Sequence, residues 1–238
     1  MLGIGRRRLK PDVAAFGKHP AFSDYIRVNT ALSMFNALTS WVDAGMKSGG
    51  ADLIKTGGIH SFRFWIRGGH KKILLAGIVK SSSDSMGRIY PLLITGQVAM
   101  TDFHRQWHRV FDRFKDMFRT FEEMGAARYD RFNEFETALS EVRLPDIHDN
   151  CFDESSEFSN SLAAWSLKSG ADDALILPVP VFLKQYEPPT DNGSVQLKRI
   201  PGCEPPKAVF IGGLPEKPIT AIYQRPLRTT DFCRLLSE

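Results

Sequence analysis

The sequence predicts an α/β fold with a mixed, partly antiparallel sheet. The expected elements follow the order strand, helix, three strands, three helices, then strands and a final helix, which is typical of a mixed α/β arrangement whose sheet is not purely parallel. Gly68-Gly69 lies between two strand-like segments and is a typical hairpin turn, so neighbouring strands should be antiparallel there. The second of these segments, residues 73–79, is continuously apolar, as expected for a central strand buried on both faces.

The other expected strands are shorter or alternate in polarity. Residues 13–16 form an apolar run near the start of the chain, and residues 62–67 alternate between the two sides of a half-buried strand. Residues 90–95 predict another strand, with Pro91 at its start because proline lacks the N–H that a strand interior needs. Residues 208–211 predict a short strand near the end of the chain.

The expected helices follow from apolar residues at helical spacing. The first begins at Asn29 or Thr30 and extends to about Lys47. The most regular one begins at Thr101 or Asp102, and we interpret its aromatic stripe as a core-packing face. This stripe consists of Phe103, Trp107, Val110, Phe111, Phe114, Met117, Phe118 and Phe121. Further helices are expected over residues 126–142, over residues 159–168 and from Thr229 or Thr230 onward.

The charge of the chain is concentrated at its start. The 238 residues contain 31 Lys and Arg against 27 Asp and Glu, a net charge of +4. Four side chains near the start carry this excess, which leaves the rest neutral: Arg6, Arg7, Arg8 and Lys10. We therefore predict a basic N-terminal arm (residues 1–11) and one neutral domain (residues 12–238). A duplex-binding domain carries its basic excess on the folded surface, so no nucleic-acid partner is expected.

Cysteine usage and hydropathy indicate the compartment. Cys151, Cys203 and Cys233 are widely spaced and odd in number, which favours reduced thiols and a cytoplasmic location. The longest aliphatic run, residues 73–79, is far shorter than the roughly 20 residues of a membrane-spanning helix. We therefore expect no membrane insertion.

The sequence lacks the common catalytic and cofactor motifs. His104 and His108 have a spacing that suits two metal ligands on a helix, but Arg105 stands where the zincin motif has glutamate. Neither a phosphate-binding GxxxxGK[ST] loop nor a GxSxG nucleophile elbow is present. We therefore expect no metal, no cofactor and no enzymatic activity.

A polar loop between two expected strands, residues 81–88, is the most informative segment. Gly87 can adopt a positive φ, and Asp84 can fix the turn by bonding its own backbone. Arg88 can pair with Asp84 or with another carboxylate such as Asp24. One interpretation is a connection that locks the strand register. The alternative is a small hydrolase or anion-binding enzyme that uses Ser83, Asp84 and Arg88.

Three motifs carry a resemblance to a known family. The opening one resembles "GKLP…GDF" and includes Gly17, Lys18, His19, Pro20, Asp24 and Tyr25. The middle one resembles "G…PSxDxxGRxYPL" and includes Gly77, Ser83, Asp84, Gly87, Arg88, Tyr90 and Pro91. The last one resembles "GLP" and consists of Gly213, Leu214 and Pro215. Together they resemble the TagF (ImpM) family of bacterial type VI secretion accessory proteins. Ser23 and Ser82 depart from the Gly and Pro usual in that family.

This resemblance implies a fold and a function. It implies a three-layer α/β/α sandwich without a catalytic site. It also implies posttranslational, negative control of type VI secretion through binding to the forkhead-associated scaffold protein of that system. Within this interpretation Asp24, Asp84 and Arg88 are expected to be architectural.

Charged loop residues are the expected partner-binding surface, because loops that carry charge without a core role often make such contacts. These candidates are Lys18, His19, Asp146, Asp149, Asp153 and Glu154.

Overall fold

The computed structural model describes residues 12–30, 32–69, 73–100, 103–145, 156–168, 173–186 and 204–238. The expected basic arm and the acidic candidates Asp146, Asp149, Asp153 and Glu154 lie outside these residues. The division of the chain into an arm and one domain therefore stays a prediction.

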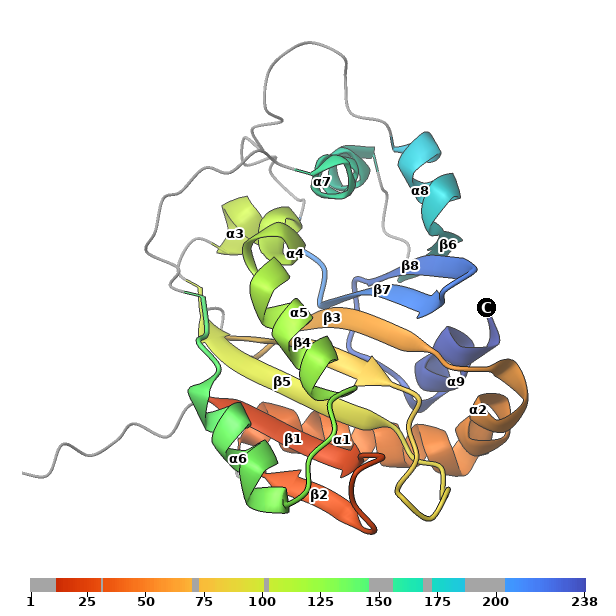
Figure 1. Ribbon diagram of the computed structural model, residues 1–238. Helices are drawn as coiled ribbons and strands as arrows, with labels where there is room; N and C mark the ends of the chain where they lie inside the picture. Colours follow the sequence, from red (N-terminus) through yellow and green to blue (C-terminus); the bar gives the residue numbers. More distant parts are fainter. Residues whose placement is uncertain are drawn as a thin grey trace, which may run out of the picture.

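The described strands form one sheet of eight in the order β2-β1-β5-β4-β3-β7-β8-β6 (Figure 1). Neighbouring strands in the sheet are often distant in the sequence, and β3 lies beside β7. The bounds are β1 Val13–Lys18, β2 Tyr25–Val28, β3 Ser61–Arg67, β4 Ile73–Lys80, β5 Leu92–Ala99, β6 Ala174–Pro178, β7 Ala208–Leu214 and β8 Lys217–Tyr223.

The expectation of a mixed sheet is wrong, because every strand pairing in the described part of the chain is antiparallel. Short connections join β1 to β2, β3 to β4, β4 to β5 and β7 to β8, and short connections between neighbours permit only antiparallel pairing. The long helical connections bring β3 and β6 beside strands that run in the opposite direction.

The helices occupy the long connections between strands, except for the last helix, which follows the last strand. Their bounds are α1 Ser33–Gly45, α2 Ala51–Gly57, α3 Phe103–Gln106, α4 Val110–Arg113, α5 Lys115–Met124, α6 Phe132–Glu141, α7 Glu157–Lys168, α8 Val179–Gln185 and α9 Thr229–Ser237. A π-helical turn, η1 Met46–Gly50, joins α1 to α2, and a 3₁₀ turn, η2 Trp107–Arg109, joins α3 to α4. Across the described residues, no helix has the length and apolar content needed to span a bilayer.

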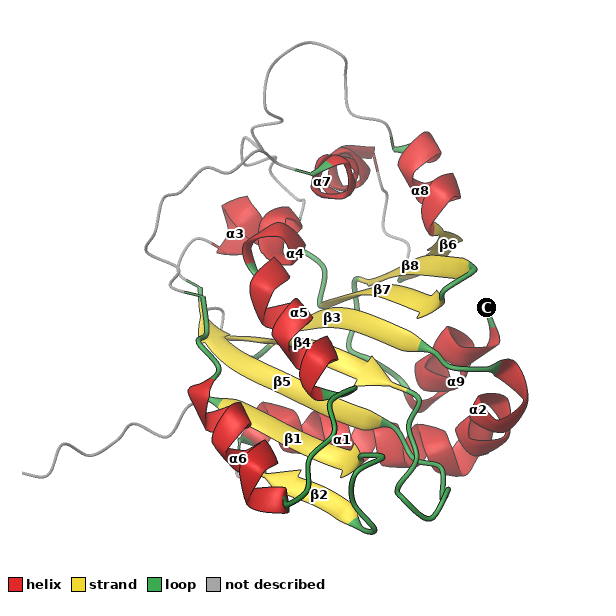
Figure 2. Cartoon of the chain, in the orientation of Figure 1, coloured by secondary structure: helices red, strands yellow, loops and turns green. Residues whose placement is uncertain are grey.

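Helices cover both faces of the sheet (Figure 2). Side chains alternate between faces along each strand, so Phe62 and Phe64 of β3 point into one core and Trp65 into the other. The first core contains side chains of α1, α2 and α9, and the second contains side chains of α3 to α8. The central strand β4 contributes side chains to both cores. This confirms the expectation that the apolar run of residues 73–79 is a strand buried on both faces.

The aromatic stripe is buried along its whole length, which confirms its interpretation as a core face. The single long helix expected there is instead broken into α3, η2, α4 and α5. The breaks occur at Gln106 (φ −126°, ψ 5°), Arg109 (φ −93°, ψ 4°) and Phe114 (φ −103°, ψ 12°), which have non-helical backbone angles. With the chain redirected in this way, Phe103 and Trp107 pack on Trp65 at centroid distances of 5.3 and 6.1 Å.

Two glycines in the α1–η1 segment make room for the last helix. A Cβ on Gly45 would lie 2.4 Å from Cδ1 of Phe232 in α9, and a Cβ on Gly50 would lie 2.8 Å from Cε1 of the same ring. The Phe232 ring also packs edge-on against Trp41 at 5.3 Å. Glycine at these positions therefore allows α9 to dock closely on α1.

We predict that Gly45→Ala destabilises the protein by about 1–3 kcal/mol, the usual cost of overpacking, because the added methyl group would overlap the Phe232 ring. Urea denaturation would measure the change. Gly69→Ala is the matched control, since a Cβ there meets no atom within 4 Å. Equal stability of the two variants would contradict this account of α9 docking.

Candidate functional site

The family motifs meet at one end of the sheet. There β1 ends at Lys18, β4 ends at Lys80 and β5 begins at Leu92. Gly17 has a φ of +119°, and a Cβ at this position would lie 1.9 Å from the carbonyl oxygen of Pro91. Only glycine lets β1 approach the start of β5 so closely, and this approach carries Lys18 toward the loop between β4 and β5.

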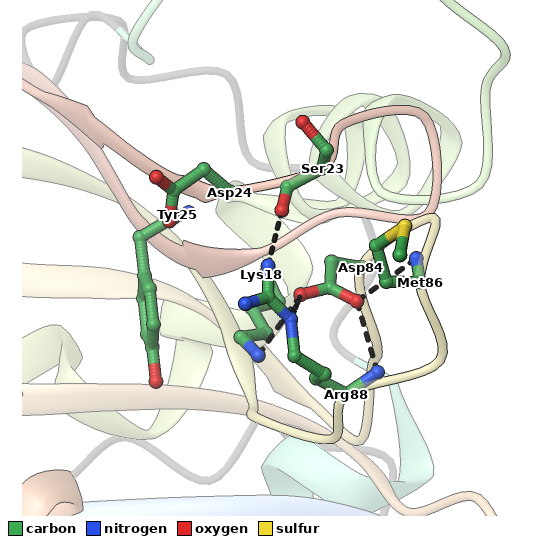
Figure 3. A network of polar contacts seen from close by, with 7 residues as sticks. All are labelled: Lys18, Ser23, Asp24, Tyr25, Asp84, Met86 and Arg88. Carbon is green, nitrogen blue, oxygen red and sulfur yellow. Dashed lines mark hydrogen bonds and ion pairs between the residues drawn. The ribbon is translucent and has the colours of Figure 1, made fainter.

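The carboxylate of Asp84 is the centre of this site (Figure 3). Its Oδ1 accepts the backbone N–H groups of Met86 and Arg88 at 3.0 and 2.9 Å. Its Oδ2 lies 3.0 Å from Nζ of Lys18 and accepts a hydrogen bond from Nε of Arg88 at 2.7 Å. Each oxygen therefore has two donors, and the side chain of Asp84 has no exposed surface.

The environment keeps Asp84 ionised. Burial by itself raises the pKa of this carboxyl, but the backbone N–H of Arg88 and the side chains of Lys18 and Arg88 together hold the pKa well below its usual range. The ammonium group of Lys18 is also buried, whereas Arg88 is 58% exposed. The site is thus an internal ion pair with one cation at the surface.

The same loop is attached to the turn between β1 and β2. Ser85 donates its N–H to the carbonyl of Phe22 at 2.8 Å, and the Arg88 guanidinium donates to the carbonyl of Ser23. Gly87 has a φ of +76°, which confirms its expected turn role. Ser83 forms a bridge with Ile89 that closes the base of the loop. These bonds support the interpretation of the loop as a connection that locks strand register.

The expectation that Lys18 and His19 form an exposed surface is wrong. Lys18 is 5% exposed and His19 is fully buried. Nδ1 of His19 accepts the N–H of Ala21 at 3.1 Å, so Nε2 carries the proton and donates to the carbonyl of Met124 at 3.0 Å. Burial lowers the pKa of His19, which favours this neutral form. Both side chains are buried because each binds a buried group far away in the sequence: Lys18 binds Asp84 and His19 binds Met124.

Aromatic residues of the opening and middle motifs are also in contact. Tyr25 packs edge-on against Tyr90 with ring centroids 5.0 Å apart, and the Lys18 ammonium lies 5.1 Å from the centre of the Tyr25 ring. The Tyr90 hydroxyl donates to a carboxylate oxygen of Asp43 in α1. Burial, reinforced by this bond, raises the pKa of Tyr90 far above its usual value. The sequence gives no signal for the pairing with Asp43, which is 47 residues away.

The remaining motif residues have simpler roles. Asp24 is exposed and accepts the N–H of Tyr25 at 2.7 Å, and Pro20 is an exposed turn residue. A Cβ on Gly77 would lie 2.2 Å from the carbonyl oxygen of Ile94, so this glycine allows β4 and β5 to approach. Gly213 pairs with Ser61 and has a φ of +115°; it leads through Leu214 and Pro215 into the β7–β8 turn at the same sheet end.

The two histidines at metal-ligand spacing lie in different surroundings. His104 is exposed on α3, whereas His108 is buried in η2 and desolvation lowers its pKa to about 4. Among the described residues, no group of three or more His, Cys, Asp or Glu side chains could hold a metal ion.

Comparison with known proteins identifies the family. The model of the TagF N-terminal domain, described as type VI secretion system-associated, matches residues 14–143, which is more than half of the chain. The chain belongs to the TagF family. The matched span contains the Lys18–Asp84–Arg88 network, so the network belongs to the part of the chain that carries the TagF match.

A solved structure shares the TagF chain's fold. The crystal structure of PA0076 from Pseudomonas aeruginosa PAO1 aligns with a TM-score of 0.56 at 15% sequence identity. The alignment covers 94% of this chain and 93% of that one. At this identity the likeness concerns the fold alone. No curated protein sequence matches the chain.

We predict that Arg88→Ala costs more than the roughly 0.5 kcal/mol of an ordinary surface substitution, because it removes one partner of a buried carboxylate. Arg119→Ala is the matched control. Arg119 is 67% exposed and pairs with Asp116 at 2.8 Å, but Asp116 is itself exposed. Chemical denaturation should show a larger loss for Arg88→Ala; losses of equal size would refute the architectural role of the network.

The ion pair also predicts a pH dependence. The pKa of the Asp84 carboxyl is lower in the folded state than in the unfolded state, where it is about 3.9. The ionised carboxylate therefore stabilises the fold fully above the unfolded pKa, and this stabilisation is lost as the pH falls below the unfolded pKa. We expect Asp84→Asn to lose less stability than the unmodified protein between pH 7 and pH 3, measured by urea denaturation. Asp116→Asn, at an exposed carboxylate, should behave as the unmodified protein does. A steeper acid loss in Asp84→Asn would contradict the prediction.

Proposed function

We propose that this chain is a non-enzymatic, cytoplasmic accessory protein of the type VI secretion system, built on a three-layer α/β/α sandwich. In this role it restrains secretion posttranslationally by binding the forkhead-associated scaffold protein of the system. Family membership supports the link to type VI secretion. The saturated network at Asp84 supports the choice of a binding function over a chemical one.

The network favours binding because it fixes the shape of an exposed loop. Asp84 accepts the N–H of Met86, and the Met86 side chain is 72% exposed at the loop tip. Ile89 in the same loop is 36% exposed, and Ile59, which precedes β3 at this end of the sheet, is 69% exposed. Apolar side chains on a rigid, solvent-facing frame suit a protein partner, because binding then costs little ordering entropy.

The alternative, a hydrolase or anion-binding enzyme, would use Ser83, Asp84 and Arg88. An incoming anion would compete with Asp84 for both Lys18 and Arg88. Asp84 is also ionised and saturated with donors, so it has little capacity to accept a proton from a substrate. These contacts favour the architectural role of the loop over the catalytic one.

The loop tip allows a direct test of scaffold binding. We expect the unmodified protein to co-purify with the forkhead-associated scaffold from cells that carry the secretion system, and Met86→Arg to lose this association. Val181→Arg is the control, because Val181 is an exposed apolar residue of α8 outside the motif loop. Both variants should keep the unmodified melting temperature. Failure of the unmodified protein to capture the scaffold would refute the proposed partner.

A genetic measurement tests the regulatory role separately. Deletion of the protein should raise secretion in a strain in which the system can fire. Unchanged secretion and unchanged scaffold assembly after deletion would refute the role, even if the two proteins associate.

A further inference from the structure

A cavity of about 590 Å³ lies at the other end of the sheet from the family motifs. It is bounded by α1, the end of β3, the start of β7 and the segment that precedes α9. The register places Arg67 of β3 opposite Leu74, whereas the motif end of β3 places Ser61 opposite Lys80. The cavity is therefore separate from the Asp84 site, and its volume is in the range of small-molecule binding sites.

The inner wall of the cavity is apolar and fixed in place. Met34, Leu38 and Trp41 line it from α1, and Ile66 and Leu227 line it from the opposite side. The indole N–H of Trp41 donates to the carbonyl of Arg228 at 2.8 Å, and its ring packs on Phe232. This wall is preformed, so an apolar group could enter it without rearrangement of the core.

The described residues at the mouth of the cavity carry an excess of positive charge. The Arg67 side chain is 9% exposed, and its Nη2 lies 3.4 Å from Oε2 of Glu204. Lys207 Nζ lies 3.8 Å from the same oxygen, beyond hydrogen-bond distance. Two cations thus share one carboxylate, which is itself 74% exposed. His104 of α3 also lines the cavity.

We propose that this cavity binds a small amphipathic carboxylate. Its apolar tail lies against the α1 wall, and its carboxylate replaces that of Glu204 on Arg67. A guanidinium offers two parallel N–H donors to a carboxylate, and the long contact to Glu204 leaves this geometry unused. The low exposure of Arg67 strengthens the bond, because water competes little for a group in this position.

Isothermal titration calorimetry with decanoate, below its micelle concentration, tests the proposal. We expect saturable one-to-one binding to the full chain. Arg67→Gln should weaken decanoate binding about tenfold, which corresponds to the loss of one charge-assisted hydrogen bond. The same variant should bind decanol, which lacks the carboxylate, as the unmodified protein does. Arg63→Gln is the matched control, because Arg63 lies on the same strand but pairs with Glu122 outside the cavity.

Two further variants keep the test decisive. Glu204→Gln removes the competing carboxylate at an exposed position and should tighten decanoate binding severalfold. Ala37→Trp, at an exposed position of α1 that lines the cavity, should weaken both probes by filling the space. The proposal is overturned if the unmodified protein shows no saturable binding of decanoate. It is also overturned if decanoate affinity does not change in Arg67→Gln and Glu204→Gln.

Discussion

The buried carboxylate of Asp84 is the interaction on which the motif end of the molecule depends. A charge without exposed surface is stable only if every lone pair has a donor, and here the donors come from β1, from the loop itself and from Arg88. Arg88 and Ser85 in turn hold the β1–β2 turn through the carbonyls of Ser23 and Phe22. Satisfying one carboxylate therefore fixes the loop, the turn and the end of β1 together.

The second constraint is the close approach of neighbouring backbones, which makes the Asp84 ion pair possible. Gly17 and Gly77 lie where a Cβ would overlap a carbonyl oxygen of the neighbouring segment, at 1.9 and 2.2 Å. These contacts bring β1 and β4 against β5 and so align Lys18 with the loop that carries Asp84. The family motif thus combines glycines, which allow the strands to approach closely, with charged residues, which form an ion pair across that approach.

The two ends of the sheet differ in what they offer to other molecules. At the motif end the Asp84 carboxylate is saturated with donors, and exposed apolar residues such as Met86 lie on the loop that it fixes. The opposite end encloses an apolar cavity with cationic groups at its mouth. The sheet between them is covered by helices on both faces (Figure 1). Its strands supply residues to both ends: Lys18 of β1 belongs to the Asp84 site, and Arg67 of β3 lines the cavity. This division supports the proposal that the protein acts by binding.

The sequence by itself determined the α/β class, the central strand, the buried aromatic stripe, the turn at Gly87 and the family, because each depends on residues close together in the chain or on a local motif. Tertiary structure decided the rest. Partners far away in the sequence decide the antiparallel pairing of β1 with β5, β3 with β7 and β6 with β8. They also decide the burial of Lys18 and His19. The breaks at Gln106, Arg109 and Phe114 likewise appear only in the tertiary structure. Lys18 and His19 look like solvated loop residues until Asp84 and Met124 are placed beside them. Local pattern encodes what a residue prefers, whereas burial and charge pairing are decided by which distant segment the fold brings into contact.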